Sequence, residues 1–283
     1  MHPVLVEIGS FEYHTYGAAL VCGFLAMLGW AHLEARRRGL EPWFVNELGI
    51  VVLLGAVVGG RLFYVVEHAP HFAAAPWGAL MYWEGGMTSM GSGLGALLAG
   101  SLLAFFRRQP VRPWLDAFAP GCALAQVVVR LGCFSAGCGW GKVTDWPWAI
   151  TFIHPQTLAP RYLPLHPTQI LLAGVGAVSF LVLIGVRRRM LDSPGRLMGL
   201  FAMLYAGMRF PIEYLRGDVL RVSEWWSSTQ ILLVLVFLFG IWLVTRGHRF
   251  GPASLADSQR PEVVGVDAYL RVNNVVAAGG SEA

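Results

Sequence analysis

Seven long apolar runs divide the sequence, and each approaches the roughly 20 residues that an α-helix needs to cross a bilayer. They are centred on residues 16–35, 46–66, 87–106, 117–137, 168–186, 197–214 and 228–245. No internal repeat stands out. The pattern predicts an all-α integral membrane protein with seven transmembrane helices.

Composition supports the same class. Hydrophobic residues make up 55% of the chain and charged residues 13%, against about 25% charged residues in soluble domains. Mean hydropathy is +0.55. The net charge of +4 comes mostly from short arginine clusters, which in a membrane protein indicate topology rather than nucleic-acid binding. The N-terminus has no basic segment before its first apolar run, so we expect no cleaved signal peptide.

The arginine clusters predict the orientation. They follow the first, third, fifth and seventh runs: Arg36, Arg37, Arg38, Arg107, Arg108, Arg112, Arg187, Arg188, Arg189, Arg196, Arg246 and Arg249. The alternate linkers carry only Lys142, Arg161, Arg216 and Arg221. By the positive-inside rule, the N-terminus is periplasmic and the C-terminus cytoplasmic. Residues 1–250 then form one transmembrane domain, and residues 251–283, mixed in composition without a strong period, are expected to be a disordered cytoplasmic tail.

Three arginines fall inside predicted spans: Arg61, Arg130 and Arg209. Placing such a charge in the bilayer costs about 2.5–3.5 kcal/mol on insertion scales, so each needs compensation or a function. The predicted topology puts all three in the outer half of the membrane. Since the guanidinium fork matches phosphate oxygens, together they could bind an anionic lipid headgroup. Alternatively they reach the interface, or pair internally, as Arg209 can with Glu213 four residues later.

Glycines accompany these arginines. Those between Gly91 and Gly95 are explained by close packing of helices through small residues. Gly85 and Gly86, at the outer end of the third span, could instead let backbone N–H groups approach a phosphate.

Six short motifs occur in a fixed order. They are H-T-Y-G at 14–17, G-G-R-L-F-Y-V at 59–65, W-E-G-G-M-T-S-M-G-S-G-L-G at 83–95, R-L-G-C-F-S-A-G-C-G-W-G-K-V-T-D at 130–145, H-P-T-Q at 166–169 and Y-A-G-M-R-F-P-I-E-Y-L-R at 205–216. In this order the chain resembles bacterial prolipoprotein diacylglyceryl transferase, from residue 10 to about residue 245.

The resemblance implies seven transmembrane helices with an external N-terminus, in the bacterial inner membrane. It implies transfer of the diacylglyceryl group of phosphatidylglycerol to the lipobox cysteine of a preprolipoprotein, the first step of lipoprotein maturation, with no cofactor. Arg130 matches the family's phosphatidylglycerol-binding arginine and Arg209 a second essential arginine. With the residues discussed above, the expected catalytic residues are Arg130, Arg209 and Tyr16, and the expected substrate-binding residues are Arg130, Arg61, Gly85, Gly86, Gly141, Tyr205 and Glu213.

The chain departs from the family's motifs at positions that concern the thiol. Met90 stands where the family has a histidine, a candidate base for the incoming thiol. In the 130–145 segment the family's pattern is replaced by Cys133, Ala136, Cys138 and Lys142. Possible replacement bases are Glu84, Asp145 and His166, all predicted near the outer surface.

Cys133 and Cys138 allow three interpretations. They could form a disulfide facing an oxidising exterior, one could accept a diacylglyceryl group as a nucleophile, or both could be small buried hydrophobes. The chain lacks the paired C-x-x-C spacing of zinc sites, so no metal is expected. Two other functions remain open: a paralogue that binds phosphatidylglycerol without transfer, and a thiol redox membrane protein.

Overall fold

The computed structural model describes residues 3–8, 11–74, 76–81, 85–219 and 226–246. All of these belong to one compact unit, Met1–Gly247. The predicted disordered tail, residues 251–283, lies outside the described residues, as does Glu84.

A helix covers each of the seven predicted spans. These helices are α1 (Thr15–Arg37), α2 (Trp43–Glu67), α4 (Ser89–Phe106), α5 (Val111–Ala136), α6 (Thr168–Val186), α7 (Arg196–Glu213) and α8 (Ser228–Thr245). Within the described chain, five of them are long and apolar enough to cross a membrane: α1, α2, α5, α6 and α8. The other two have 18 residues each. The protein is therefore a helical, multi-pass membrane protein, and the full count of seven spans stays a prediction.

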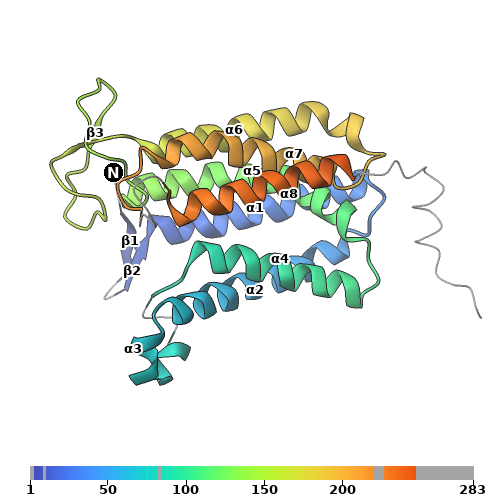
Figure 1. Ribbon diagram of the computed structural model, residues 1–283, viewed down its shortest axis with the longest axis horizontal. Coiled ribbons are helices and arrows are strands. Elements are labelled where there is room, and N and C mark those ends of the chain that lie inside the picture. The colour runs from blue at the N-terminus through green and yellow to red at the C-terminus, as the bar shows by residue number, and fades with distance from the viewer. Residues whose placement is uncertain (1–2, 9–10, 75, 82–84, 220–225, 247–283) are drawn as a thin grey trace, which may run out of the picture. The chain divides into compact units, whose positions relative to one another are not determined.

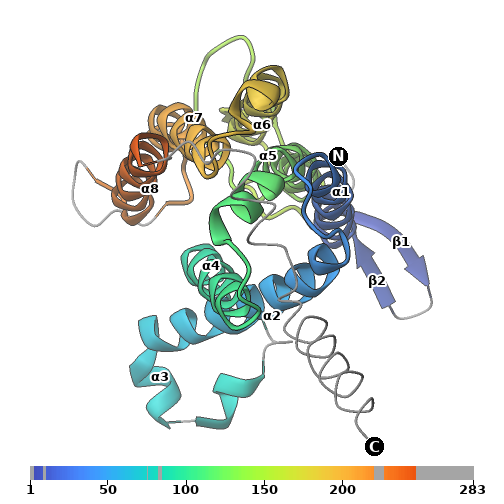
Figure 2. The ribbon, with the colours of Figure 1, turned by 90° about the vertical axis from the view of Figure 1, so that its right-hand side faces the viewer.

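The helices pack in pairs (Figure 1). The most extensive contacts join α1 to α5, α5 to α6, α7 to α8 and α2 to α4. Figure 2 shows α1, α5, α6, α7 and α8 nearly end-on, with α5 between α1 and α6. In this arrangement α5, which carries Arg130, is contacted by helices from both halves of the sequence.

Small elements fill the linkers, and the all-α prediction did not include them. Strands β1 (Val4–Ile8) and β2 (Phe11–His14) form an antiparallel pair before α1, and β3 (Ile150–Thr151) pairs with β4 (Pro164–Leu165) between α5 and α6. Three short helices complete the described elements: α3 (Ala69–Ala74), η1 (Pro76–Leu80) and η3 (Arg187–Met190).

Glycines let α2 and α4 approach closely. A Cβ atom added to Gly95 would lie 2.1 Å from the carbonyl oxygen of Gly55, and one added to Gly91 would lie 2.4 Å from that of Gly59. Both distances are far below van der Waals contact, so no larger residue fits without moving a helix. This confirms the predicted small-residue packing at Gly91 and Gly95, whereas nothing lies within 4 Å of the Cβ position of Gly93.

Acidic side chains are buried at the opposite end of α5 from Arg130. Glu34 and Asp116 are 0% exposed. Arg38 pairs with both, at 3.3 Å and 3.2 Å, and Arg187 pairs with Glu34 at 3.4 Å. Asp116 also accepts hydrogen bonds from backbone N–H groups at the start of α7. Two of the arginines that predicted the orientation thus also tie α1, α5 and the end of α6 together.

Candidate functional site

The chain segment after α5 lies between the end of α7 and the start of α6. The Lys142 N–H donates to the carbonyl of Leu215 at 2.7 Å, and the His166 N–H donates to the carbonyl of Lys142 at 3.0 Å. The Gly217 N–H donates to the carbonyl of Trp140 at 3.0 Å. Backbone pairing therefore brings together three motifs that are far apart in the sequence: R-L-G-C, H-P-T-Q and the end of Y-A-G-M-R-F-P-I-E-Y-L-R.

A left-handed turn lets α5 end directly beside this junction. Gly137, the residue after the helix, has φ +81° and Gly139 has φ +69°. Glycine adopts these angles without the steric cost of a side chain. These two glycines let the chain turn back across the end of α5, toward the side chain of Arg130.

Arg130 and Arg216 face the same glycine. A Cβ atom placed on Gly139 would lie 3.7 Å from Nη1 of Arg130 and 4.0 Å from Nη2 of Arg216. None of the ion pairs within the described ranges involves Arg130. Within the described ranges, a permanent cation without a carboxylate partner thus lies beside a buried glycine.

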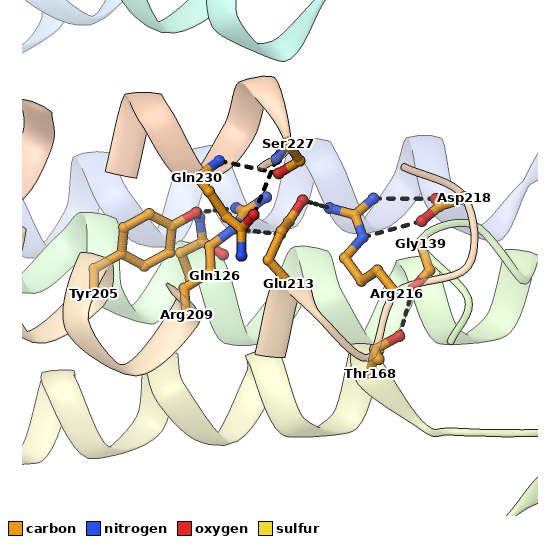
Figure 3. Close-up of polar contacts among 10 residues, drawn as sticks. All are labelled: Gln126, Gly139, Thr168, Tyr205, Arg209, Glu213, Arg216, Asp218, Ser227 and Gln230. Carbon is orange, nitrogen blue, oxygen red and sulfur yellow. Dashed lines mark hydrogen bonds and ion pairs between the residues drawn. The ribbon is translucent and has the colours of Figure 1, made fainter. Parts of the chain in front are cut away.

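Arg216 is held by two carboxylates (Figure 3). Its Nε and Nη2 donate to the two oxygens of Asp218 at 3.0 Å and 3.1 Å, and Nη1 donates to Oε1 of Glu213 at 3.4 Å. Burial alone would lower the pKa of Arg216, but its bonds to Asp218 and Glu213 outweigh this and raise the pKa above the ordinary value. Its guanidinium is therefore charged at every physiological pH.

Glu213 joins two arginines. Its side chain is fully buried, with Oε2 3.6 Å from Nε of Arg209 and Oε1 bonded to Arg216. The predicted pairing of Arg209 with Glu213 is confirmed. Since this carboxylate serves both arginines, it fixes the distance between them.

Tyr205 connects Arg209 to α5. Its hydroxyl accepts hydrogen bonds from Nη1 of Arg209 and, at 3.4 Å, from Nε2 of Gln126. Figure 3 shows these side chains in one row with Glu213 and Arg216. Gln126 lies one helical turn before Arg130 on α5, so the row ends close to the unpaired cation.

Two residues at the start of α6 hold the turn that contains Gly139. Oγ1 of Thr168 donates to the carbonyl of Gly139 at 2.6 Å, and Nε2 of Gln169 donates to that of Cys138 at 3.1 Å. The same segment explains Gly141: an added Cβ atom there would lie 2.4 Å from the carbonyl oxygen of His166. Gly141 is thus required for packing, and its role in substrate binding stays a prediction.

Tyr16 and Cys133 lie close enough to Arg130 to interact with its charge. Tyr16 is coupled electrostatically to Arg130 and to the sulfurs of Cys133 and Cys138, and the Cys133 sulfur interacts with the Arg130 guanidinium. The expected catalytic residues Arg130 and Tyr16 are therefore neighbours, while Arg209 is linked to α5 through Tyr205.

The cysteines form no disulfide. Cys133 and Cys138 are free, and Sγ of Cys138 donates to the carbonyl of Cys133 at 3.7 Å. The expectation of a disulfide is wrong for this structure. The contact with Cys133, together with burial, raises the pKa of the Cys138 thiol. A raised thiol pKa keeps the sulfur protonated at neutral pH, which argues against Cys138 as a nucleophile.

The candidate bases differ in their positions. His166 is partly buried beside Gly141, and its Nδ1 has no hydrogen-bond partner in the described chain. Asp145 is exposed. Met90 belongs to α4, and its side chain, like Glu84, is outside the described residues.

Arg61 has other partners. Its Nε, Nη1 and Nη2 atoms donate to the backbone carbonyls of Gly78, Ala79, Met81, Gly85 and Gly86. These bonds use every N–H of the guanidinium group, and they turn the carbonyls of Gly85 and Gly86 toward Arg61. The expected site of three arginines is thus corrected: Arg61 organises the loop between α2 and α4, and its role in substrate binding, with that of Gly85 and Gly86, stays a prediction.

Sequence reasoning missed the residues that complete the site. Arg216 was treated as a loop charge, although it follows Glu213 by three residues, a spacing that favours an ion pair. Gln126 lies four residues before Arg130, on the same helical face. Thr168 and Gln169 were noted only as part of a motif.

Comparison with known proteins shows the family to which the chain belongs. Residues 3–246 match the sequence profile of the family described as prolipoprotein diacylglyceryl transferase. The chain is 30% identical over 254 residues to a phosphatidylglycerol–prolipoprotein diacylglyceryl transferase of Solidesulfovibrio magneticus, covering 86% of this chain and 94% of that protein. It is 32% identical to the enzyme of the same name from Tolumonas auensis, covering 83% and 94%. For that of Chromohalobacter salexigens the identity is 33%, covering 87% and 92%. The match extends over nearly all of both chains, and the protein belongs to the prolipoprotein diacylglyceryl transferase family.

Proposed function

We propose that this protein transfers the diacylglyceryl group of phosphatidylglycerol to the lipobox cysteine of a preprolipoprotein. Family membership supports this reaction class. The observation that carries the proposal is the convergence of Arg130 and Arg216 on Gly139, because two neighbouring cations suit a phosphate group.

In the reaction the cysteine sulfur attacks the glycerol carbon that carries the phosphate. A C–S bond forms, the C–O bond to the phosphate breaks, and glycerol phosphate leaves while the thiol proton passes to a base. Negative charge grows on the leaving phosphate. Donors held in advance around this phosphate stabilise the transition state more than water can.

The charges at the site suit this role. The cations Arg130, Arg209 and Arg216 face two carboxylates, Glu213 and Asp218, so one positive charge remains uncompensated. That charge is on Arg130, which we assign to the phosphate. Tyr16, as its neighbour, can donate a hydrogen bond to the same headgroup, while Tyr205 and Glu213 hold Arg209 and Arg216.

The acceptor thiol needs a base, because the thiolate is the nucleophile. Of the candidates, we favour His166, because it adjoins Gly141 and its Nδ1 has no partner within the described segments. A covalent role for Cys138 loses support, because the contact with Cys133 and burial raise the pKa of its thiol, whereas the free thiol of Cys133 stays an alternative.

We also propose the finer topology. Seven helices would span the bacterial inner membrane, with the N-terminus outside. Arg130 and the loop after α5 would then lie near the outer surface, where a secreted preprolipoprotein arrives. Residues 1–250 would form this single domain.

Complementation tests the function in a cell. A bacterium whose own diacylglyceryl transferase is depleted should grow and process its lipoproteins when it expresses this chain, and an Arg130→Gln variant produced to the same level should not restore growth. If wild type fails while the Chromohalobacter salexigens relative restores growth, transferase activity is excluded. A paralogue that only binds phosphatidylglycerol would give that result while retaining lipid binding.

A further inference from the structure

The start of α6 holds two consecutive carbonyl groups of the turn after α5. Thr168 and Gln169 donate to the carbonyls of Gly139 and Cys138, at 2.6 Å and 3.1 Å. Both side chains are 0% exposed. Because the donors are neighbouring residues of one helix, they fix the position and the orientation of both peptide groups.

Backbone hydrogen bonds anchor the two ends of this turn: the N–H of Gly137 donates to the carbonyl of Cys133 at 2.9 Å, and the N–H of Gly217 donates to that of Trp140 at 3.0 Å. Gly137 and Gly139 flank Cys138, and both have positive φ. Glycine can take up many backbone angles, so a segment with a glycine on each side of one residue acts as a hinge unless it is held. In the described chain the side chains that hold these two carbonyls are Thr168 and Gln169.

The same turn lies against both cations. Nη1 of Arg130 and Nη2 of Arg216 lie 3.7 Å and 4.0 Å from the Cβ position of Gly139. Charge-assisted hydrogen bonds to a phosphate oxygen need about 2.7–2.9 Å between heavy atoms. One phosphate can therefore bond both guanidinium groups only if the turn stays in place. A displacement of about 1 Å can cost about a hundredfold in rate.

We infer that Thr168 and Gln169 are positioning residues of the transferase site, which keep Gly139 where one phosphate can bond Arg130 and Arg216 together. They touch neither the substrate nor the reacting atoms, and act through the turn. This inference rests on the proposed function, since it concerns how the same headgroup is bound.

The test uses a matched set of variants of the full chain. Thr168→Val keeps the shape of the side chain and removes the donor, whereas Thr168→Ser keeps the donor. Ser179→Ala is the control: Ser179 lies on the same helix, is 0% exposed, and its hydroxyl has no hydrogen-bond partner in the part of the chain that the structure describes. Each variant is purified in detergent, and kcat, KM, the melting temperature and binding of short-chain phosphatidylglycerol are measured.

We expect Thr168→Val to lower kcat/KM by about thirtyfold or more, because misplacing a group by about 1 Å can cost about a hundredfold in rate. We also expect it to weaken phosphatidylglycerol binding. Its melting temperature should stay close to that of Ser179→Ala. Thr168→Ser should recover to within about threefold of wild type, as a conservative replacement of the donor. If Thr168→Val does not fold, Gln169→Met, which removes the second donor, is measured in its place.

The inference is overturned if the valine variant keeps wild-type kcat/KM, or if its loss of activity equals its loss of folded protein. Failure of the proposed function looks different, because wild type itself would then transfer nothing. In that case the affinity for phosphatidylglycerol tests the inference instead. Equal affinity of wild type and Thr168→Val overturns the inference, and weaker binding by the variant supports it.

Discussion

The guanidinium groups of Arg130 and Arg216 lie on the same side of Gly139, each within 4.0 Å of the position that its Cβ atom would take. The two arginines come from the ends of different helices and differ in their partners. Arg216 is bound by Glu213 and Asp218, whereas no carboxylate of the described chain pairs with Arg130. Arg216 is thus fixed in place by its carboxylates, while Arg130 carries the charge that is left uncompensated.

Arg130→Gln should remove activity without unfolding the protein. Because Arg130 has no carboxylate partner among the described residues, its loss leaves no buried charge unpaired. We expect kcat/KM to fall by at least a hundredfold, as for loss of a main charge-stabilising donor, with an unchanged melting temperature. Arg161→Gln, at an exposed position, is the control. A large fall in melting temperature of Arg130→Gln would show a structural role instead.

Glu213→Gln should destabilise the protein as well as inactivate it. The change leaves Arg209 and Arg216 without the carboxylate that they share, and breaking a buried ion pair costs about 3–5 kcal/mol. Thermal unfolding in detergent measures this loss. Asp218→Asn, at a more exposed position, should cost less than about 1 kcal/mol, as for a surface pair. Equal stability of the two variants would contradict the central position of Glu213.

Gly141→Ala should prevent correct packing after α5. The added methyl group would overlap the backbone of His166, which cannot move as a flexible side chain can. Overpacking costs about 1–3 kcal/mol or more, so we expect a lower melting temperature and a loss of transfer. Gly174→Ala, where nothing lies within 4 Å of the added atom, should melt like wild type. A Gly141→Ala variant as stable as that control would argue against this contact.

The thiol of Cys138 should react slowly at neutral pH. Its pKa is raised by the contact with Cys133 and by burial, so the thiolate fraction grows only as the pH rises well above neutrality. Labelling with a maleimide, followed by mass spectrometry, should be slow at pH 7 and faster at pH 9. Fast labelling at pH 7, or a diacylglyceryl adduct on this residue during turnover, would restore the covalent hypothesis.

Arg61→Lys should loosen the loop between α2 and α4 rather than abolish headgroup binding. Lysine has three donors in place of the planar set of five, so it cannot bond all five carbonyl groups that Arg61 holds. We expect faster proteolysis within residues 76–88 and a smaller rise in KM for phosphatidylglycerol than in Arg130→Lys. A larger rise in KM than in Arg130→Lys would favour direct binding of the headgroup by Arg61.

The sequence predicts the helices well because a span of about 20 apolar residues is a local property. The seven predicted spans agree closely with the seven long helices. Strands β3 and β4 could not be predicted, because each has two residues and exists only through long-range backbone pairing.

The site was predicted in part. The place of an arginine within an apolar span can be seen in the sequence, which singled out Arg130 and Arg209. Both are partly buried in the structure, and their depth in the membrane stays a prediction. The sequence does not show which arginines lie side by side in the plane of the membrane. Arg61 was therefore grouped with Arg130 and Arg209, although its N–H groups bind the loop between α2 and α4. Arg216 was missed for the opposite reason: it lies just beyond its helix, and only the backbone bridge to Gly141 brings it to Gly139.

The most direct measurement of the central claim is transfer by the purified protein. Wild type is incubated in detergent with phosphatidylglycerol and a lipobox peptide, and the products are followed by mass spectrometry. We expect a peptide heavier by one diacylglyceryl group and an equal amount of released glycerol phosphate, with neither product from Arg130→Gln. An unmodified peptide, under conditions in which the Chromohalobacter salexigens relative modifies it, would exclude the proposed transfer.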